Sequence, residues 1–240
     1  MLLAIDTSAG TSVAIVDRDR GILAEHSSAD TRLHAEIIGT LIVSCLRDAG
    51  ISRSELSGVV AGMGPGPFTG LRVGIAAAEA FALGISKPVV RVVSHDAIAL
   101  AHYAAGDTAA SGGTDSADNT DSADNTDSAE YTDSAEHTGP LLVVTDARRR
   151  EVYWSSYRGI DAQGLPQRVD TPGLVRPDEL SATVPDFARY TRLDAAVVSA
   201  GSLGLLAELM FAHGRPFASA APLYLREADA VAATTVKRVN

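Results

Sequence analysis

Apolar residues in the first half of the chain fall into short runs separated by turn residues and by longer amphipathic segments. Short apolar or alternating runs bounded by Gly, Asp or Ser are typical of strands. By this criterion the predicted strands are 2–6, 13–17, 22–27, 58–62 and 88–93. Only short turns separate the first three, which predicts an antiparallel meander.

Segments with a helical period alternate with these strands. Between Thr31 and Ala49 the apolar positions recur at helical spacing, and Gly50 then marks the end of a helix. Ser52 and Glu55 have the spacing of a capping box, which predicts a short helical turn. The predicted helices are 31–49, 70–84 and 94–105.

The second half returns to a similar order in a less regular form. Its predicted strands are 141–147, 151–159 and 194–201, with a short helix from Pro177 and a longer one over 202–214. Arg148, Arg149 and Arg150 form the turn between the first two of these strands. Two such halves predict a duplicated α/β fold with mixed sheets flanked by helices and a degenerate second half.

An acidic repeat lies between the halves. Residues 114–137 are four copies of a six-residue unit (TDSADN, TDSADN, TDSAEY, TDSAEH) with eight carboxylates and no Lys or Arg. A polar, self-repelling segment cannot bury enough apolar surface to offset its ordering entropy. We therefore predict an N-terminal subdomain over 1–105, a disordered insertion over 106–139 and a C-terminal subdomain over 140–240. The insertion is interpreted as a solvated loop, with an acidic interaction segment as the alternative.

Composition argues against several classes of protein. The formal charge is −10, but outside the repeat 22 acidic and 20 basic residues leave only −2, too little to hold nucleic acid unaided. The single cysteine, Cys45, excludes an intramolecular disulfide and favours a reducing compartment. Neither a signal peptide nor an apolar run long enough to span a membrane is evident. These features predict a cytoplasmic protein without membrane contact.

A loop rich in glycine and proline, GMGPGPFTGLRVG, occupies residues 62–74. A phosphate cradle needs consecutive backbone N–H donors, but Pro65 and Pro67 have none, and no Lys-Ser/Thr pair follows the glycines. We interpret the segment as a stiffened structural loop. Its residues are Gly64, Pro65, Gly66, Pro67, Phe68, Thr69, Gly70 and Arg72.

Arg72 is unfavourably placed if Thr69 caps the following helix. A cation in the first turn opposes the helix dipole by roughly a few tenths of a kcal/mol. We therefore expect an anion beside Arg72, preferably a carboxylate within the fold and alternatively one on a partner chain.

Both long helices of the first half have unusual surfaces. A helix packed on one side needs an apolar stripe of about 100°, whereas the apolar positions of 31–49 are spread more widely. The helix over 70–84 is rich in Gly and Ala, which allow another backbone to approach closely. Burial on both sides within one subunit and contact with another chain both explain this pattern.

Few residues have the arrangement of a catalytic or metal site. Asp6, Thr7 and Ser8 follow the first strand, as the first phosphate loop does in actin-like ATPases and sugar kinases, but a hydrogen-bonded turn is the simpler interpretation. A second histidine four residues after His34 would complete a metal-binding pair, but that position holds Ile38. We therefore predict no catalytic residue and no metal site.

Five segments together resemble the bacterial TsaB (YeaZ) family. They are LLAIDTSAGTSVAIVD at 2–17, HAE at 34–36, GMGPGPFTGLRVG at 62–74, DARRREVYW at 146–154 and PLYLRE at 222–227. The string GPGPFTGLR is the most specific of them, and the resemblance covers essentially the whole chain except the repeat. It implies a fold of the ASKHA superfamily, shared with acetate and sugar kinases, Hsp70 and actin, and a paralogue of the catalytic protein TsaD.

The resemblance also implies a role in tRNA modification. TsaD holds a metal with a His-x-x-x-His pair and transfers threonylcarbamoyl to adenosine 37 of tRNA, whereas here only His34 of that pair is present. The expected protein is a non-catalytic scaffold without a cofactor. It activates a TsaD-like enzyme together with a TsaE-like ATPase and meets tRNA only through that complex.

In the family, the helices of the first half pair with TsaD or with a second copy of the chain. Carried onto this sequence, the expected interface is Leu33, His34, Ile37, Leu41, Gly74, Ala77, Ala78 and Phe81. Asp6, Thr7 and Ser8 are then a vestigial phosphate loop. The alternatives are an M22-type metallopeptidase and an ATP-binding phosphotransfer protein that uses these three residues.

Overall fold

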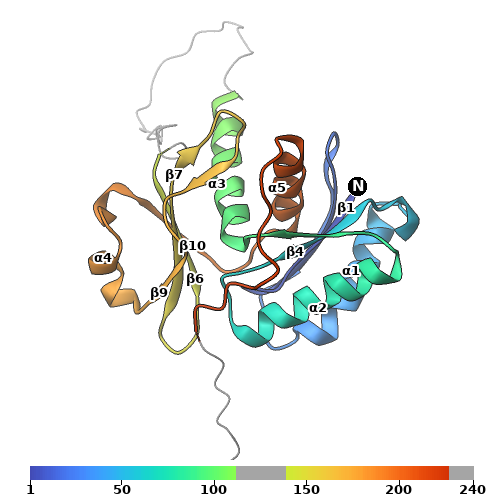
Figure 1. Cartoon of the computed structure of the whole chain (residues 1–240), viewed down its shortest axis with the longest axis horizontal. Helices are drawn as coiled ribbons and strands as arrows, with labels where there is room; N and C mark the ends of the chain where they lie inside the picture. The colour runs from blue at the N-terminus through green and yellow to red at the C-terminus, as the bar shows by residue number, and fades with distance from the viewer. Residues whose placement is uncertain (112–138, 227–240) are drawn as a thin grey trace, which may run out of the picture.

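The computed structural model describes residues 1–111 and 139–226 (Figure 1). The acidic repeat, and with it the prediction that it is disordered, lies outside the described residues. No helix within the described ranges is both long and apolar enough to cross a membrane.

The first sheet has the strand order β3-β2-β1-β4-β5. Its meander is antiparallel, whereas β4 and β5 run parallel to β1, so the sheet is mixed. The strands are β1 (Leu2–Asp6), β2 (Thr11–Asp17), β3 (Gly21–Ser28), β4 (Gly58–Gly62) and β5 (Val89–Val92). All five strands predicted for this half are therefore confirmed, and the capping box is present around a short 3-10 helix, Arg53–Glu55.

Helices α1 (His34–Asp48) and α2 (Phe68–Gly84) cover one face of this sheet. Alternate residues of the central strands point toward them, as the two-residue period of a strand requires. The resulting core contains Leu3, Ile5, Val13 and Ile15 from the strands and Ile38, Ile42, Cys45, Ala78 and Ala82 from the helices. Ala4, Ala14 and Val16 face the opposite side, toward α5 (Ala200–Ala212).

The second sheet has the order β10-β6-β7-β8, and β9 also pairs with β7. Its strands are β6 (Leu141–Asp146), β7 (Val152–Ile160), β8 (Pro166–Arg168), β9 (Gly173–Val175) and β10 (Thr191–Ala195). The hairpin β6–β7 matches β1–β2, and β10 runs parallel to β6 as β4 does to β1. A short α4 (Leu180–Thr183) between two 3-10 turns stands where the first half has α1. The predicted duplication with a degenerate second half is confirmed.

Helices α3 (Ser94–Ser111) and α5 pack against each other between the two sheets (Figure 1). Residues from both helices and both sheets share one core, which includes Tyr103, Leu141, Val143, Tyr157, Leu203 and Leu206. The outer face of the second sheet has a smaller core, in which Leu142, Val144 and Trp154 meet Leu180 and Val184. The helix pair therefore joins the two halves.

Three features differ from the predictions, two in the second half and one at the end of the first. The strand predicted at 194–201 is wrong: β10 ends at Ala195, and Ser199 Oγ accepts the Ser202 N–H at 3.0 Å to cap α5. Of the apolar run there, Val198 is buried in a loop and Ala200 in the first helical turn, whereas β10 is a mainly polar edge strand. β8 and β9 were not predicted because each has only three residues. The helix predicted to end near residue 105 continues to Ser111.

Candidate functional site

The turn after β1 is buried and occupied by its own hydrogen bonds. One oxygen of Asp6 accepts the N–H (2.8 Å) and the hydroxyl (2.6 Å) of Ser8, and the other accepts the Ser94 hydroxyl at 2.5 Å. Burial raises the pKa of the Asp6 carboxyl, although these hydrogen bonds oppose the rise. Both carboxylate oxygens are therefore engaged within the fold.

Thr7 joins the same turn to α2. Its hydroxyl donates to the Gly70 carbonyl (2.7 Å) and accepts the Gly74 N–H (3.0 Å). A Cβ at position 74 would lie 2.2 Å from Thr7 Oγ1, so no residue larger than glycine fits without displacing this contact. The N-terminal part of α2 is thereby fixed directly against the turn.

The glycine-proline loop covers the turn from the other side. A Cβ on Gly66 would come within 2.9 Å of the Ser8 backbone. Gly64 has a φ of +86°, and its N–H donates to Ser94 Oγ (2.9 Å) while its carbonyl accepts the Ser94 N–H (2.8 Å). The peptide bond between Gly64 and Pro65 is cis. The N–H groups of Gly64 and Gly74 are thus used inside the chain.

The C-terminal segment holds this loop against the second half. The Leu223 N–H donates to the Met63 carbonyl (2.9 Å), and the rings of Tyr224 and Phe68 lie 4.8 Å apart. Arg226 pairs with Glu151 and donates to the Ala147 carbonyl (3.4 Å). The loop, the tail and the second hairpin therefore form one continuous structure.

The structure corrects the preferred expectation for Arg72, a carboxylate within the fold, whereas a carboxylate on a partner chain stays a prediction. Its guanidinium lies over the Phe68 ring, 5.0 Å from the ring centre, and it forms no ion pair with any carboxylate of the described residues. A cation over an aromatic face is attracted by the ring quadrupole. Thr69 is not the cap either, because Pro67 precedes the first helical residue and α2 begins at Phe68. Arg72 therefore lies further inside the helix than predicted.

His34 is an internal residue. It is 8% exposed, and its Nδ1 lies 2.7 Å from Thr11 Oγ1. Burial, and secondly the Arg148 guanidinium, lower the pKa of the imidazole. Ile38, one turn further along, is part of the core, and no three His, Cys, Asp or Glu side chains are grouped for a metal in the part of the chain that the structure describes.

The eight residues expected at the helix interface divide into two groups. His34, Gly74 and Ala78 are buried within the chain, so burial against the first sheet, and not a second polypeptide, explains these three. Leu33 is exposed, and the other four keep part of their surface accessible: Ile37, Leu41, Ala77 and Phe81. Val43 (63% exposed) and Leu83 (81% exposed) lie on the same two helices and were missed, because periodicity does not identify the outward face of a helix that is apolar on several sides.

The turn of the second hairpin lies opposite Ser8. Arg148, Arg149 and Arg150 have φ values of 62°, 55° and 62°, a left-handed conformation that is costly for non-glycine residues. Arg148 pairs with Asp146 (3.3 Å) and donates to the Thr31 hydroxyl. Two cavities of about 190 and 230 Å³ adjoin this arginine and Ser8. Each is smaller than the roughly 300–1,000 Å³ of typical ligand pockets.

His95 links α3 to the second sheet and was not assigned a role from the sequence. It is fully buried, with Nδ1 2.8 Å from Ser155 Oγ and Nε2 2.9 Å from Thr145 Oγ1. Burial lowers the pKa of this imidazole to about 3. The contacts are structural, because they lie inside the core between the halves.

Comparisons with known proteins agree with this architecture. The family model for TsaD, tRNA N6-adenosine threonylcarbamoyltransferase, matches residues 10–116. An uncharacterized protein of Mycobacterium tuberculosis is 36% identical over 95% of this chain and 93% of its own length. The tRNA threonylcarbamoyladenosine biosynthesis protein TsaB of Escherichia coli is 27% identical, with 94% of each chain covered.

A solved structure from Pseudomonas aeruginosa, described as similar to the peptidase YeaZ, superposes with a TM-score of 0.66. It shares 26% identity, and the match covers 94% of this chain and 99% of that one. The resemblance inferred from the five sequence segments is thereby confirmed, as is the ASKHA-type fold. This chain belongs to the TsaB (YeaZ) family.

Proposed function

We propose that the chain is a non-catalytic cytoplasmic subunit in the formation of threonylcarbamoyladenosine at adenosine 37 of tRNA. In this proposal it binds and activates a TsaD-like threonylcarbamoyltransferase, together with a TsaE-like ATPase. The relative from E. coli supports the pathway by its name, and the TsaD model supports the relation to the catalytic partner.

One observation carries the non-catalytic part of the proposal: the place of the first phosphate loop is filled by the chain itself. Asp6 and Thr7 make their hydrogen bonds to Ser8, Ser94, Gly70 and Gly74. Gly66 lies on Ser8, where a phosphate would approach the turn. A nucleotide would have to displace this loop before it reached Asp6, which disfavours the ATP-binding alternative.

The docking surface in this proposal is the exposed side of α1 and α2. The chain leaves three large apolar residues exposed there: Val43 and Leu83 on the helices, and Leu33 directly before α1. Three more apolar residues of the two helices, Ile37, Leu41 and Phe81, keep part of their surface accessible. Covering apolar side chains that are in contact with water lowers the free energy, so it favours binding of a partner. A TsaD-like chain is the proposed occupant, and a second copy of this chain is its substitute when TsaD is absent.

Contact with tRNA is assigned to the complex. Outside the acidic repeat the formal charge is only −2, and binding to phosphate backbones depends on clustered cations. Arg148, Arg149 and Arg150 alone are too few to supply most of that affinity.

The test is reconstitution of tRNA modification from purified components, with threonylcarbamoyl adenylate supplied as the donor in every reaction. We expect no product with this chain alone, little with cognate TsaD and TsaE, and full modification when all three are present. Leu33→Asp should abolish the stimulation, whereas Val169→Asp, an equally drastic change at an exposed position of the second half, should not. Modification by this chain alone, or stimulation that survives Leu33→Asp, would contradict the proposal.

A further inference from the structure

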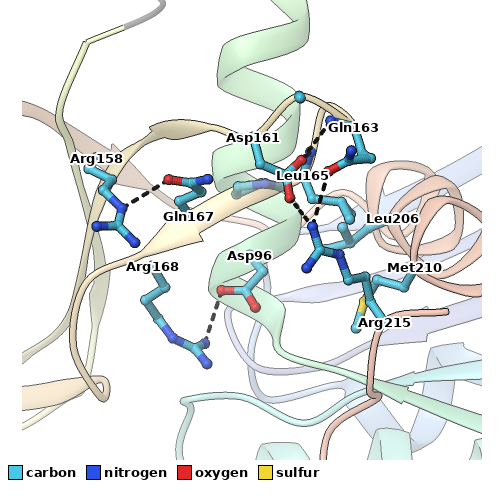
Figure 2. A pocket seen from close by; sticks show the side chains of 12 residues that line it. Asp96, Arg158, Asp161, Gln163, Leu165, Gln167, Arg168, Leu206, Met210 and Arg215 are labelled. Carbon is cyan, nitrogen blue, oxygen red and sulfur yellow. Dashed lines mark hydrogen bonds and ion pairs between the residues drawn. The ribbon is translucent and has the colours of Figure 1, made fainter. Parts of the chain in front are cut away.

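A further cavity lies where the second half meets α3, and the proposed function does not use it. It has a volume of about 570 Å³ and opens between the β7–β8 hairpin, α3 and the C-terminal end of α5 (Figure 2). This volume is within the range of roughly 300–1,000 Å³ found for small-molecule sites.

Charged side chains occupy much of the lining. Arg168 pairs with Asp96 at 2.9 Å, and Arg215 pairs with Asp161 at 2.5 Å. Arg158 donates from Nε to the Gln167 side-chain oxygen (2.9 Å) and pairs with no carboxylate among the described residues. The lining holds three guanidinium groups and two carboxylates and so has one excess positive charge, whereas the chain outside the acidic repeat has a formal charge of −2. The local field favours an anion.

The two carboxylates are held in place by other parts of the fold. Asp96 also accepts the hydroxyl of the buried Tyr157 at 2.7 Å. Asp161 accepts the N–H groups of Gln163 (2.9 Å) and Leu165 (3.0 Å). Each guanidinium has five N–H donors, and these ion pairs use only some of them. The arginines are therefore oriented before a ligand arrives, with donors to spare.

The remaining wall is apolar. Leu165 and Leu206 are less than a tenth exposed, and Met210 and Pro166 lie beside them. Figure 2 shows Leu206 and Met210 on the side of the cavity near Arg215, away from Arg158. A purely inorganic ion would leave this wall uncovered, whereas an organic anion would use both parts of the lining.

We propose that this cavity binds a small organic anion, whose phosphate or carboxylate group is held by the arginines and whose apolar body lies on Leu206 and Met210. The site is independent of the helices proposed to meet the catalytic partner. Its recognition combines charge-assisted hydrogen bonds with an apolar platform, the usual composition of a small-molecule site.

Methionine-methyl NMR of the full chain tests this directly. The chain has three methionines, and Met63 is fully buried outside the cavity, so it serves as an internal reference. Phenyl phosphate should shift the Met210 resonance, assigned with Met210→Leu, in a saturable way with a Kd below roughly 10 mM. Inorganic phosphate should bind more weakly, because it lacks the apolar body. No shift at Met210, or equal affinity for the two probes, would overturn the proposal.

A matched pair of double variants tests the arginines. Arg158→Gln with Arg215→Gln should weaken phenyl phosphate binding by roughly tenfold, because charge-assisted hydrogen bonds are lost. Arg53→Gln with Arg176→Gln removes the same charge at exposed positions outside the cavity and should leave binding unchanged. Equal weakening by both pairs would show that the effect comes only from the change in net charge. No weakening by the first pair would show that the arginines do not bind the ligand. Either result contradicts the assigned site.

Discussion

The two hairpin turns that follow β1 and β6 occupy equivalent places in the duplicated fold, but the first is buried and the second is exposed. After β1, Asp6 is buried and sealed by the glycine-proline loop and α2. After β6, Asp146 is exposed, and the turn continues through three left-handed arginines at the surface. The second half has no counterpart of the sealing loop at this place, since Ser199 caps α5 and no glycine-proline segment precedes it. One copy has therefore become a packing element while the other remains an accessible turn.

Glycine at position 74 should be the most sensitive point of the sealed turn. Gly74→Ala places a Cβ against Thr7 Oγ1 and should lower the free energy of unfolding by about 2–4 kcal/mol, from overpacking and the lost hydrogen bonds. Gly39→Ala is the control, because no atom lies within 4 Å of that Cβ and alanine favours a helix; it should raise stability by roughly 1 kcal/mol. Urea unfolding measures both. Similar values for the two variants would show that the turn is not tightly sealed.

Acid should weaken the joint between the halves through His95. Its pKa of about 3 in the folded chain lies below the ordinary value of 6.5, so between these values the unfolded chain binds a proton that the folded chain does not. Stability should therefore fall with decreasing pH, by up to about 1.4 kcal/mol per unit relative to His95→Gln. Asp6 and Asp96 have raised pKa values and act in the opposite direction, but they are present in both proteins.

Urea unfolding from pH 6.5 to 5 checks the difference between the two proteins. If His95→Gln does not fold, the protonation of His95 can be followed instead by the imidazole NMR resonances of the wild type. The His95 signal should not titrate in this range, and half-protonation near pH 6.5 would show that the residue is not buried as described.

A substitution in the exposed turn should raise the free energy of unfolding, whereas Gly74→Ala in the sealed turn should lower it. Arg150 has a φ of 62°, so Arg150→Gly relieves a left-handed conformation and should raise the free energy of unfolding by up to about 1 kcal/mol. Arg176→Gly is the matched control, because Arg176 has an ordinary φ of −70° and glycine there should only cost chain entropy. Unfolding curves of the two variants should move in opposite directions; a loss at Arg150 as large as that at Arg176 would mean that the turn is not strained.

Deleting the acidic repeat between the halves should have the smallest effect on stability. Deleting residues 114–137 removes eight carboxylates and little apolar surface, so stability should change by less than about 1 kcal/mol. Thermal unfolding at matched ionic strength measures this. A loss of several kcal/mol would show that the repeat contributes contacts to one of the halves.

Periodicity predicted most of the fold, because the central strands of the first half are apolar runs buried on both faces and its helices repeat their apolar positions at helical spacing. It failed at β10, where the exposed Thr191 and Arg192 give an edge strand no apolar signal, and at Val198, whose burial occurs in a loop. The site was harder. Arg72 was recognised as unusual, but its partner Phe68 was missed, although the two lie one helical turn apart (i, i+4) on α2. Only Tyr224 is brought to Phe68 by the folded tail.

The interface prediction was also limited by what the sequence pattern shows about the orientation of each helix. The sequence marked α1 and α2 as apolar or small on several sides, yet it could not distinguish the side that meets the first sheet. His34, Gly74 and Ala78 belong to that inner side, whereas Val43 and Leu83 point outward. Which side is inner follows from the position of each helix on the sheet.

The central claim is that the outer side of α1 and α2 binds a TsaD-like chain. The direct test is the affinity of this protein for its cognate TsaD, measured by calorimetry for the wild type, Ile37→Asp and Val169→Asp, after each variant is shown to be folded by circular dichroism. We expect Ile37→Asp to weaken binding by at least about 100-fold, because it places a charge in the proposed apolar contact, and Val169→Asp to bind like the wild type. Wild-type affinity in folded Ile37→Asp would contradict the account.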